Sequence, residues 1–180
     1  MATSTELTAK ANLNDDISAV AITNGPTNTS YSYGLWVYVN SWDMSKPKTI
    51  FNRSNNIKLY LDQNSPTLKC DILMSDDTMK TVEVTDNFPL QKWVHIIISV
   101  ANQYVDCYID GKLVRSGRAY LETDENISTP KQPPTVDTQM KLGGTSRFDA
   151  YVTKFKHWDE AISPEIAYSN YLQGNGEGVK

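Results

Sequence analysis

The feature that most constrains this chain is an alternation of apolar and polar side chains with a period of two. Residues 30–42 read SYSYGLWVYVNSW, and the alternation returns at 57–63 (IKLYLDQ), 68–74 (LKCDILM) and 80–86 (KTVEVTD). Successive side chains of a strand point to opposite faces of a sheet, so this period is typical of strands with one buried face. The sequence therefore predicts an all-β protein.

The middle of the chain predicts a central strand followed by a hairpin. Residues 93–103 (WVHIIISVANQ) are almost continuously apolar, which indicates a strand covered on both faces. In the next segment, 104–117, the pair Asp110-Gly111 separates two strand-like runs. Asp-Gly in this position is typical of a tight hairpin turn, because both residues tolerate a positive φ. Two later strands are predicted at 140–144 and 148–158.

One short helix is predicted near the C-terminus, at 163–173. Ser163 is suited to cap it, Pro164 to begin it and Gly174 to end it. Many short strands followed by a single helix predict a two-sheet antiparallel sandwich.

Two segments do not follow the strand pattern. Residues 120–137 are polar, contain three prolines and show no periodicity, which predicts a long surface loop. We expect residues 30–180 to form the sandwich domain and residues 1–29 to form an N-terminal arm with a first strand. The arm and the loop are the predicted contact elements, because polar arms of this kind often become ordered on binding.

The composition argues against two classes of partner. The net charge is −4, so we expect no nucleic-acid binding, which needs a basic surface. No stretch approaches the about 20 apolar residues of a membrane span. The first residues also lack the apolar core of a signal peptide. We therefore expect a chain that stays in the cytoplasm, or one from which a leader or anchor was removed.

One set of residues resembles a known family. The segment 93–114 is similar to the signature of laminin-G-like domains of the concanavalin A-like superfamily, which are jelly-roll sandwiches. The signature consists of a tryptophan, a histidine at the start of an apolar strand, and an aromatic-x-Asp-Gly hairpin, here Trp93, His95, Tyr108, Asp110 and Gly111.

The segments 89–96 (PLQKWVHI) and 162–174 (ISPEIAYSNYLQG) are most similar to laminin-G-like proteins of nucleocytoplasmic large DNA viruses. This resemblance implies a minor capsid or virion surface protein, made in the host cytoplasm, that binds other capsid proteins. The alternative is a lectin-like module, extracellular or displayed on a particle or cell surface, that binds glycans.

Catalysis is not expected. Glucanases of this superfamily carry Glu-x-Asp-x-x-Glu on one strand, because hydrolysis of a glycosidic bond needs paired carboxylates. The nearest match is Glu122-Thr-Asp124-Glu125-Asn-Ile127, in which Ile127 replaces the last carboxylate and which lies in the predicted loop. We therefore predict that the protein is not an enzyme.

For glycan binding, the candidate residues are Trp42, Asp43 and Tyr31. Trp42 is the best of them, because it follows a strand and is flanked by polar residues, whereas aromatic residues at alternate strand positions more often belong to the core.

Asp76 and Asp77 are weak calcium candidates. A calcium ion needs about 6–8 oxygen ligands, and no ligand-loop spacing is present, so we read the pair as turn residues and predict no cofactor.

His95 is interpreted as a strand histidine hydrogen-bonded at the surface of the sandwich, and not as a metal ligand or a base. Cys70 and Cys107 both alternate with apolar neighbours and are expected to face the core. Two buried free thiols are favoured, and a disulfide between them remains the alternative.

Overall fold

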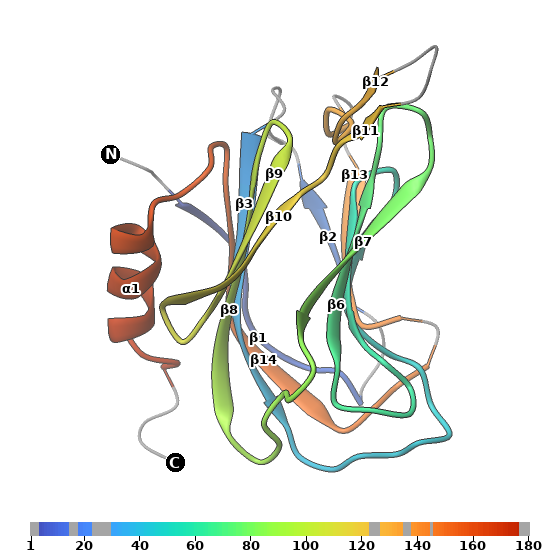
Figure 1. Ribbon diagram of the computed structural model, residues 1–180. Coiled ribbons are helices and arrows are strands. Elements are labelled where there is room, and N and C mark those ends of the chain that lie inside the picture. The colour runs from blue at the N-terminus through green and yellow to red at the C-terminus, as the bar shows by residue number, and fades with distance from the viewer. Residues whose placement is uncertain are drawn as a thin grey trace.

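The computed structural model contains two facing antiparallel sheets (Figure 1). The structure describes residues 4–14, 18–22, 30–122, 127–134, 138–144 and 146–176. Each sheet has six strands, and neighbouring strands within each sheet are antiparallel. The predicted two-sheet sandwich is therefore confirmed.

Sheet A has the strand order β1-β14-β3-β8-β9-β10. Its strands are β1 (Ser4–Asn12), β14 (Ala150–Trp158), β3 (Ser30–Val39), β8 (Trp93–Ala101), β9 (Tyr104–Ile109) and β10 (Lys112–Arg118). Sheet B has the order β2-β13-β4-β5-β6-β7. Its strands are β2 (Ser18–Ile22), β13 (Thr138–Leu142), β4 (Lys48–Arg53), β5 (Ile57–Leu61), β6 (Leu68–Leu73) and β7 (Met79–Thr85).

The main core lies between the two sheets and is built from the inward residues of the period-two pattern. Tyr33 of β3, Phe51 of β4 and Phe155 of β14 meet there, with Phe51 and Phe155 stacked at 5.1 Å between ring centroids. Burial of these large apolar surfaces is the main force that holds the sheets together.

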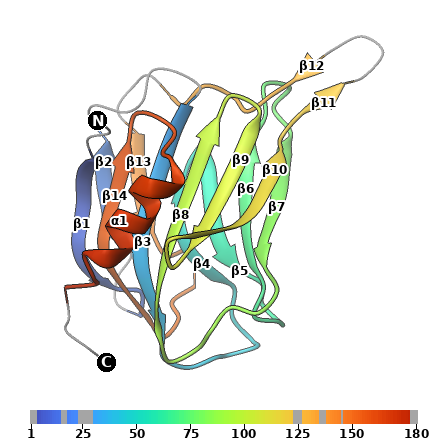
Figure 2. The same ribbon diagram turned by 60° about the vertical axis from the view of Figure 1, so that its left-hand side comes forward.

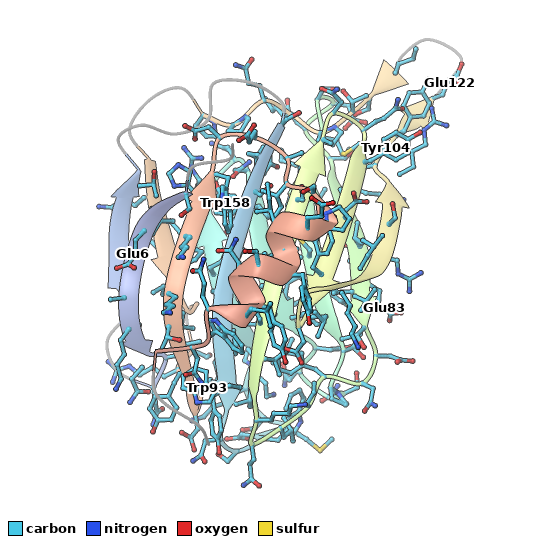
Figure 3. All side chains as sticks on the ribbon, turned by 90° about the vertical axis from the view of Figure 1, so that its left-hand side faces the viewer. Glu6, Glu83, Trp93, Tyr104, Glu122 and Trp158 are labelled. Carbon is cyan, nitrogen blue, oxygen red and sulfur yellow. The ribbon has the colours of Figure 1, made fainter. Side chains whose placement is uncertain are left out.

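Helix α1 (Pro164–Leu172) covers the outer face of sheet A (Figures 2 and 3). The Ser163 side chain caps it by accepting a hydrogen bond from the Ile166 N–H, as predicted. The helix closes a second, smaller core, in which Ala167 packs with Ile97, Tyr108, Trp158 and Ile162. Strand β8 is therefore buried on both faces, as its continuous apolar run predicts.

The predicted Asp110-Gly111 turn joins β9 to β10. Both residues have positive φ, at 50° and 78°, as a two-residue hairpin of this type requires. Glycine is needed for a second reason, because a Cβ atom on Gly111 would lie 2.9 Å from the Tyr168 ring of α1.

The described residues of the predicted N-terminal arm, 4–14 and 18–22, contain two strands, and the predicted first strand lies there. Strand β1 pairs with β14 at one edge of sheet A, and β2 pairs with β13 at one edge of sheet B. The pattern was weak because an edge strand has one neighbour and keeps much of its surface in water; every described side chain of β1 is exposed or half-buried.

The described part of the segment 120–137, which was predicted to be a loop, includes two short strands. It contains a two-stranded hairpin, β11 (Leu121–Glu122) and β12 (Ile127–Ser128), which projects from one end of the sandwich (Figure 1). Pro130 then forms an isolated bridge with Met74. Residues 123–126 and 135–137 lie outside the described part. Within the described residues, no helix is long and apolar enough to cross a membrane.

Candidate functional site

The three predicted glycan residues do not form one site. Tyr31 begins β3 and Trp42 follows its end. The strand has ten residues, so the two side chains lie toward opposite ends of the sandwich. Tyr31 is moreover only 1% exposed, and its pKa is raised by burial. It belongs to the core and cannot meet a sugar, so its assignment as a glycan residue is wrong.

Trp42 and Asp43 lie on the β3–β4 loop. Trp42 is half-buried against the main core, and the Lys48 ammonium lies 4.2 Å from its ring centroid. Asp43 is exposed and accepts hydrogen bonds from the N–H and hydroxyl of Ser45, which lower its pKa. Lys48 is itself buried and donates to the Lys46 and Gln63 carbonyls, so the ring and the cation over it pack as part of the fold.

Asp76 and Asp77 are held by their own surroundings. Asp76 accepts hydrogen bonds from the Thr78 hydroxyl and N–H, at 2.6 and 3.1 Å, which lower its pKa. Asp77 forms an ion pair with Lys131 at 2.7 Å. No group of three or more candidate metal-binding side chains occurs among the residues that the structure describes. Both aspartates act as turn residues in this arrangement.

His95 is not at the surface, and that interpretation is wrong. It is 4% exposed and lies beneath α1, with ring centroids 4.9 Å from Trp36 and 6.4 Å from Tyr171. Burial, and to a smaller extent the nearby Lys156 and Lys154 ammonium groups, lower the pKa of His95 to about 4. His95 therefore packs as a neutral ring.

The two cysteines are buried free thiols. Burial raises the pKa of Cys70, and it raises the pKa of Cys107 to about 12. Neither thiol is reactive in this state, because the thiolate is the reactive form.

A different set of residues meets at the other end of the sandwich. There a surface hollow is lined by Asn102, Gln103, Tyr120 and Thr129, which we call the terminal hollow. Two residues with side-chain amides, one aromatic residue and one with a hydroxyl thus line a single concave surface. Figure 1 shows the β11–β12 hairpin projecting beside this end of the sheets.

The terminal hollow forms where the chain crosses from sheet A to sheet B. Asn102 and Gln103 make the turn between β8 and β9, with φ of 55° at Asn102. The buried Ala119 donates its N–H to the Gln103 carbonyl at 2.7 Å, which fixes the chain just before Tyr120.

The far side of the hollow is anchored to sheet B. The Thr129 carbonyl accepts a hydrogen bond from the Ser75 N–H at 2.8 Å, and the Ser128 hydroxyl accepts one from the Asp76 N–H at 3.2 Å. The hollow is therefore held by the turns of both sheets.

Two charged side chains contact Tyr120, one over its ring and one at its hydroxyl. The Arg118 guanidinium lies 4.0 Å from the Tyr120 ring centroid, and its Nε donates to the Gln103 Oε1 at 3.1 Å. The Tyr120 hydroxyl donates to the Glu122 carboxylate at 3.4 Å. Tyr104, 49% exposed, pairs with Arg118 across β9 and β10, and Figure 3 shows Tyr104 and Glu122 in the same corner of the molecule.

These residues were missed from the sequence, because they come from three separate segments without a shared motif. One local signal existed: Asn102 and Gln103 interrupt two apolar runs, and Arg118 and Tyr120 lie at the end of the hairpin that follows.

The strand order of the two facing sheets is that of a jelly-roll sandwich. A family model described as the concanavalin A-like lectin/glucanases superfamily matches residues 14–166, and the chain belongs to that superfamily. No curated protein matches the chain.

Solved structures with the same fold include three toxin domains. The receptor-binding domain of botulinum neurotoxin C/D mosaic serotype matches with a TM-score of 0.73 and 18% identity, over 96% of this chain and 46% of that one. The ligand-binding domain of botulinum neurotoxin serotype D, in complex with N-acetylneuraminic acid, gives 0.70 and 16%, over 96% and 46%. The binding domain of Paraclostridial Mosquitocidal Protein 1 gives 0.65 and 12%, over 91% and 42%.

The chain spans less than half the length of these structures. The likeness supports the predicted concanavalin A-like fold. It does not bear on the predicted viral origin.

Proposed function

We propose that this chain is a non-enzymatic carbohydrate-recognition module and that the terminal hollow contacts the sugar. The observation that carries the proposal is that one concave surface is lined by Tyr120, Asn102, Gln103 and Thr129. An aromatic ring packs against the apolar face of a sugar, and amides and hydroxyls exchange hydrogen bonds with its hydroxyl groups.

The position of the hollow supports the same function. It lies on turns and a hairpin at the end of a rigid two-sheet scaffold, which is where binding residues are often found. Among the structures with this fold, one is named as a complex with N-acetylneuraminic acid and others as receptor-binding domains. At 16–18% identity that likeness is one of fold, so glycan binding by this chain rests on its own residues.

A role without catalysis fits the carboxylates near the hollow. Glu122 is exposed and accepts from the Tyr120 hydroxyl, and Ile127 occupies the place of the second glucanase glutamate. Asp124 and Glu125 lie outside the described residues.

The test is a glycan array, followed by calorimetry on the hits. Tyr120→Ala and Gln103→Ala are expected to lower affinity about tenfold or more, since truncated anchor residues typically cost this much. Tyr168→Ala is the matched control. It removes an exposed tyrosine next to Gly111, at the opposite end of β10, and is expected to leave binding unchanged.

Two results would contradict the proposal. One is the absence of any specific glycan. The other is binding that survives Tyr120→Ala and is lost with Trp42→Ala, which would move the site to the other end of the sandwich.

A second role, a minor capsid or virion-associated protein, remains a proposal. One observation favours a docking function: Leu113, Tyr168 and Leu172 are exposed apolar side chains on α1 and the adjoining strand β10, at 49%, 48% and 64%. Mass spectrometry of purified particles, with cross-linking to capsid proteins, would test it. Absence of the chain from particles would rule it out.

A further inference from the structure

Arg118, at the rim of the terminal hollow, is held in place and still has most of its donors available. Its guanidinium lies 4.0 Å from the Tyr120 ring centroid, and its Nε donates to the Gln103 side chain. These two contacts fix the plane of the group. Arg118 is exposed, and it forms no ion pair with a carboxylate of the described residues.

Arg115, three residues earlier on β10, shows the opposite arrangement. Its Nε donates to the Glu83 carbonyl at 3.0 Å, and its Nη2 lies 3.9 Å from the Glu83 carboxylate. Arg115 is therefore used within the fold, where it joins the neighbouring edges of the two sheets. Arg118 has no such anion among the residues that the structure describes.

Lys48, at the other end of the sandwich, provides a second contrast. It also lies over an aromatic ring, that of Trp42, but its Nζ donates to the Lys46 and Gln63 carbonyls at 2.8 and 3.0 Å. An ammonium has three donors, so Lys48 is almost saturated. A guanidinium has five donors, and the Nη groups of Arg118 have no hydrogen-bond partner among the described residues.

We propose that, on the basis of the carbohydrate-recognition role inferred above, the terminal hollow takes an anionic sugar whose carboxylate or sulfate binds the Nη groups of Arg118. The flat fork of a guanidinium matches two oxygens of such a group. Because Tyr120 and Gln103 already fix the guanidinium, little conformational entropy is lost on binding. Asn102 and Gln103 line the same hollow, where the neutral part of the sugar would lie.

Glu122 places a limit on this ligand. Its carboxylate accepts from the Tyr120 hydroxyl, so a negative charge lies at the hydroxyl end of the ring that Arg118 covers. Diffuse polyanion binding is disfavoured by that charge and by the chain's net charge of −4. One anionic group per sugar, directed at Arg118, fits both observations.

The alternative is that Arg118 only protects the exposed edge of β10 from strand pairing, as charged edge residues often do. In that case its replacement leaves every glycan affinity unchanged.

The test uses an array in which each neutral oligosaccharide core is also present in carboxylated and sulfated forms. The best core is then titrated by calorimetry at pH 7 against four proteins: wild type, Arg118→Gln, Arg118→Lys and Glu122→Gln. Thermal melting establishes that each variant is folded.

We expect the wild type to bind an anionic form more tightly than its neutral core. Arg118→Gln is expected to lower affinity for the anionic form about tenfold to 100-fold and to leave the neutral form within about twofold. Arg118→Lys keeps the charge and loses the fork, so an intermediate loss is expected. Glu122→Gln is expected to raise affinity for the anionic form by a few fold. Preference for the carboxylated or the sulfated form identifies the acidic group.

Equal losses for neutral and anionic forms in Arg118→Gln, or no preference for an anionic form in the wild type, would overturn this inference while leaving carbohydrate recognition standing. An array without any specific hit would overturn both proposals.

Discussion

The two ends of the sandwich carry the same pair of groups, a cation over an aromatic ring, with opposite consequences. At one end Lys48 is 1% exposed, lies over Trp42, and donates to two backbone carbonyls. At the other end Arg118 is exposed, lies over Tyr120, and uses one donor. The first cation is held by the fold, whereas the Nη groups of the second have no hydrogen-bond partner among the described residues. The two ends therefore differ in how many hydrogen-bond donors of the cation are left unused. They do not differ in the presence of an aromatic residue.

The largest expected effect is a pH-dependent change in the stability of the scaffold that carries both ends. His95 lies under α1, and its pKa falls from its ordinary value of 6.5 to about 4. The unfolded chain therefore takes up a proton first, and stability declines as the pH falls from about 6.5 to 4, by about 3 kcal/mol in all. Urea unfolding at a series of pH values would measure this decline.

His95→Phe is the control, because it keeps a ring beneath α1 and removes the titration. Carboxylates contribute to acid destabilisation in both proteins, so the difference between them isolates His95. Identical pH profiles would show that His95 does not have this role.

The next effect tests the end that carries Lys48. Lys48→Met removes donors from two backbone carbonyls and is expected to lower the free energy of unfolding by about 2 kcal/mol. Urea denaturation measures it. A loss of glycan binding without a loss of stability would mean that Lys48 is not held by the fold in this way.

A third prediction concerns the base of the hairpin. The Ser128 hydroxyl is buried and accepts the Asp76 N–H, so Ser128→Ala is expected to cost about 1 kcal/mol. Because this contact positions Thr129 in the terminal hollow, glycan affinity is expected to fall a few fold, without any change at the sugar contacts themselves. Normal affinity in a destabilised variant would mean that the hairpin does not shape the site.

The smallest expected effect is the stability change in Arg118→Met, at most about 0.5 kcal/mol, because an exposed cation contributes little to folding. Urea denaturation of Arg118→Met and Lys48→Met, each against the wild type, measures the two changes as a matched pair. A cost equal to that of Lys48→Met would make Arg118 a structural residue.

Most of the scaffold could be predicted from local patterns. Asp110-Gly111 determines its own turn through backbone conformation, and Ser163-Pro164 determines the start of α1. The continuous apolar run of β8 indicated burial on both faces. These features depend on residues close in sequence, so one sequence was enough.

The edges and the site could not be predicted in the same way. Strands β1 and β2 are edge strands with a weak apolar pattern. The candidate glycan residue Tyr31 alternates with core residues, and the pattern alone does not tell which end of a strand reaches the surface. The terminal hollow joins Asn102, Tyr120 and Thr129 across two sheets, a contact that depends on the whole topology.

The most direct test of the central claim is a titration of the isotope-labelled protein at pH 7, followed by amide and side-chain N–H resonances, with the tightest-binding anionic glycan of the array. Arg118 Nε–H and the Gln103 side-chain amide report on the terminal hollow, and the Trp42 indole N–H reports on the opposite end. We expect the first two resonances to shift with the same dissociation constant while the Trp42 indole resonance stays in place. A shift of the Trp42 indole with the Arg118 and Gln103 resonances unchanged would contradict it.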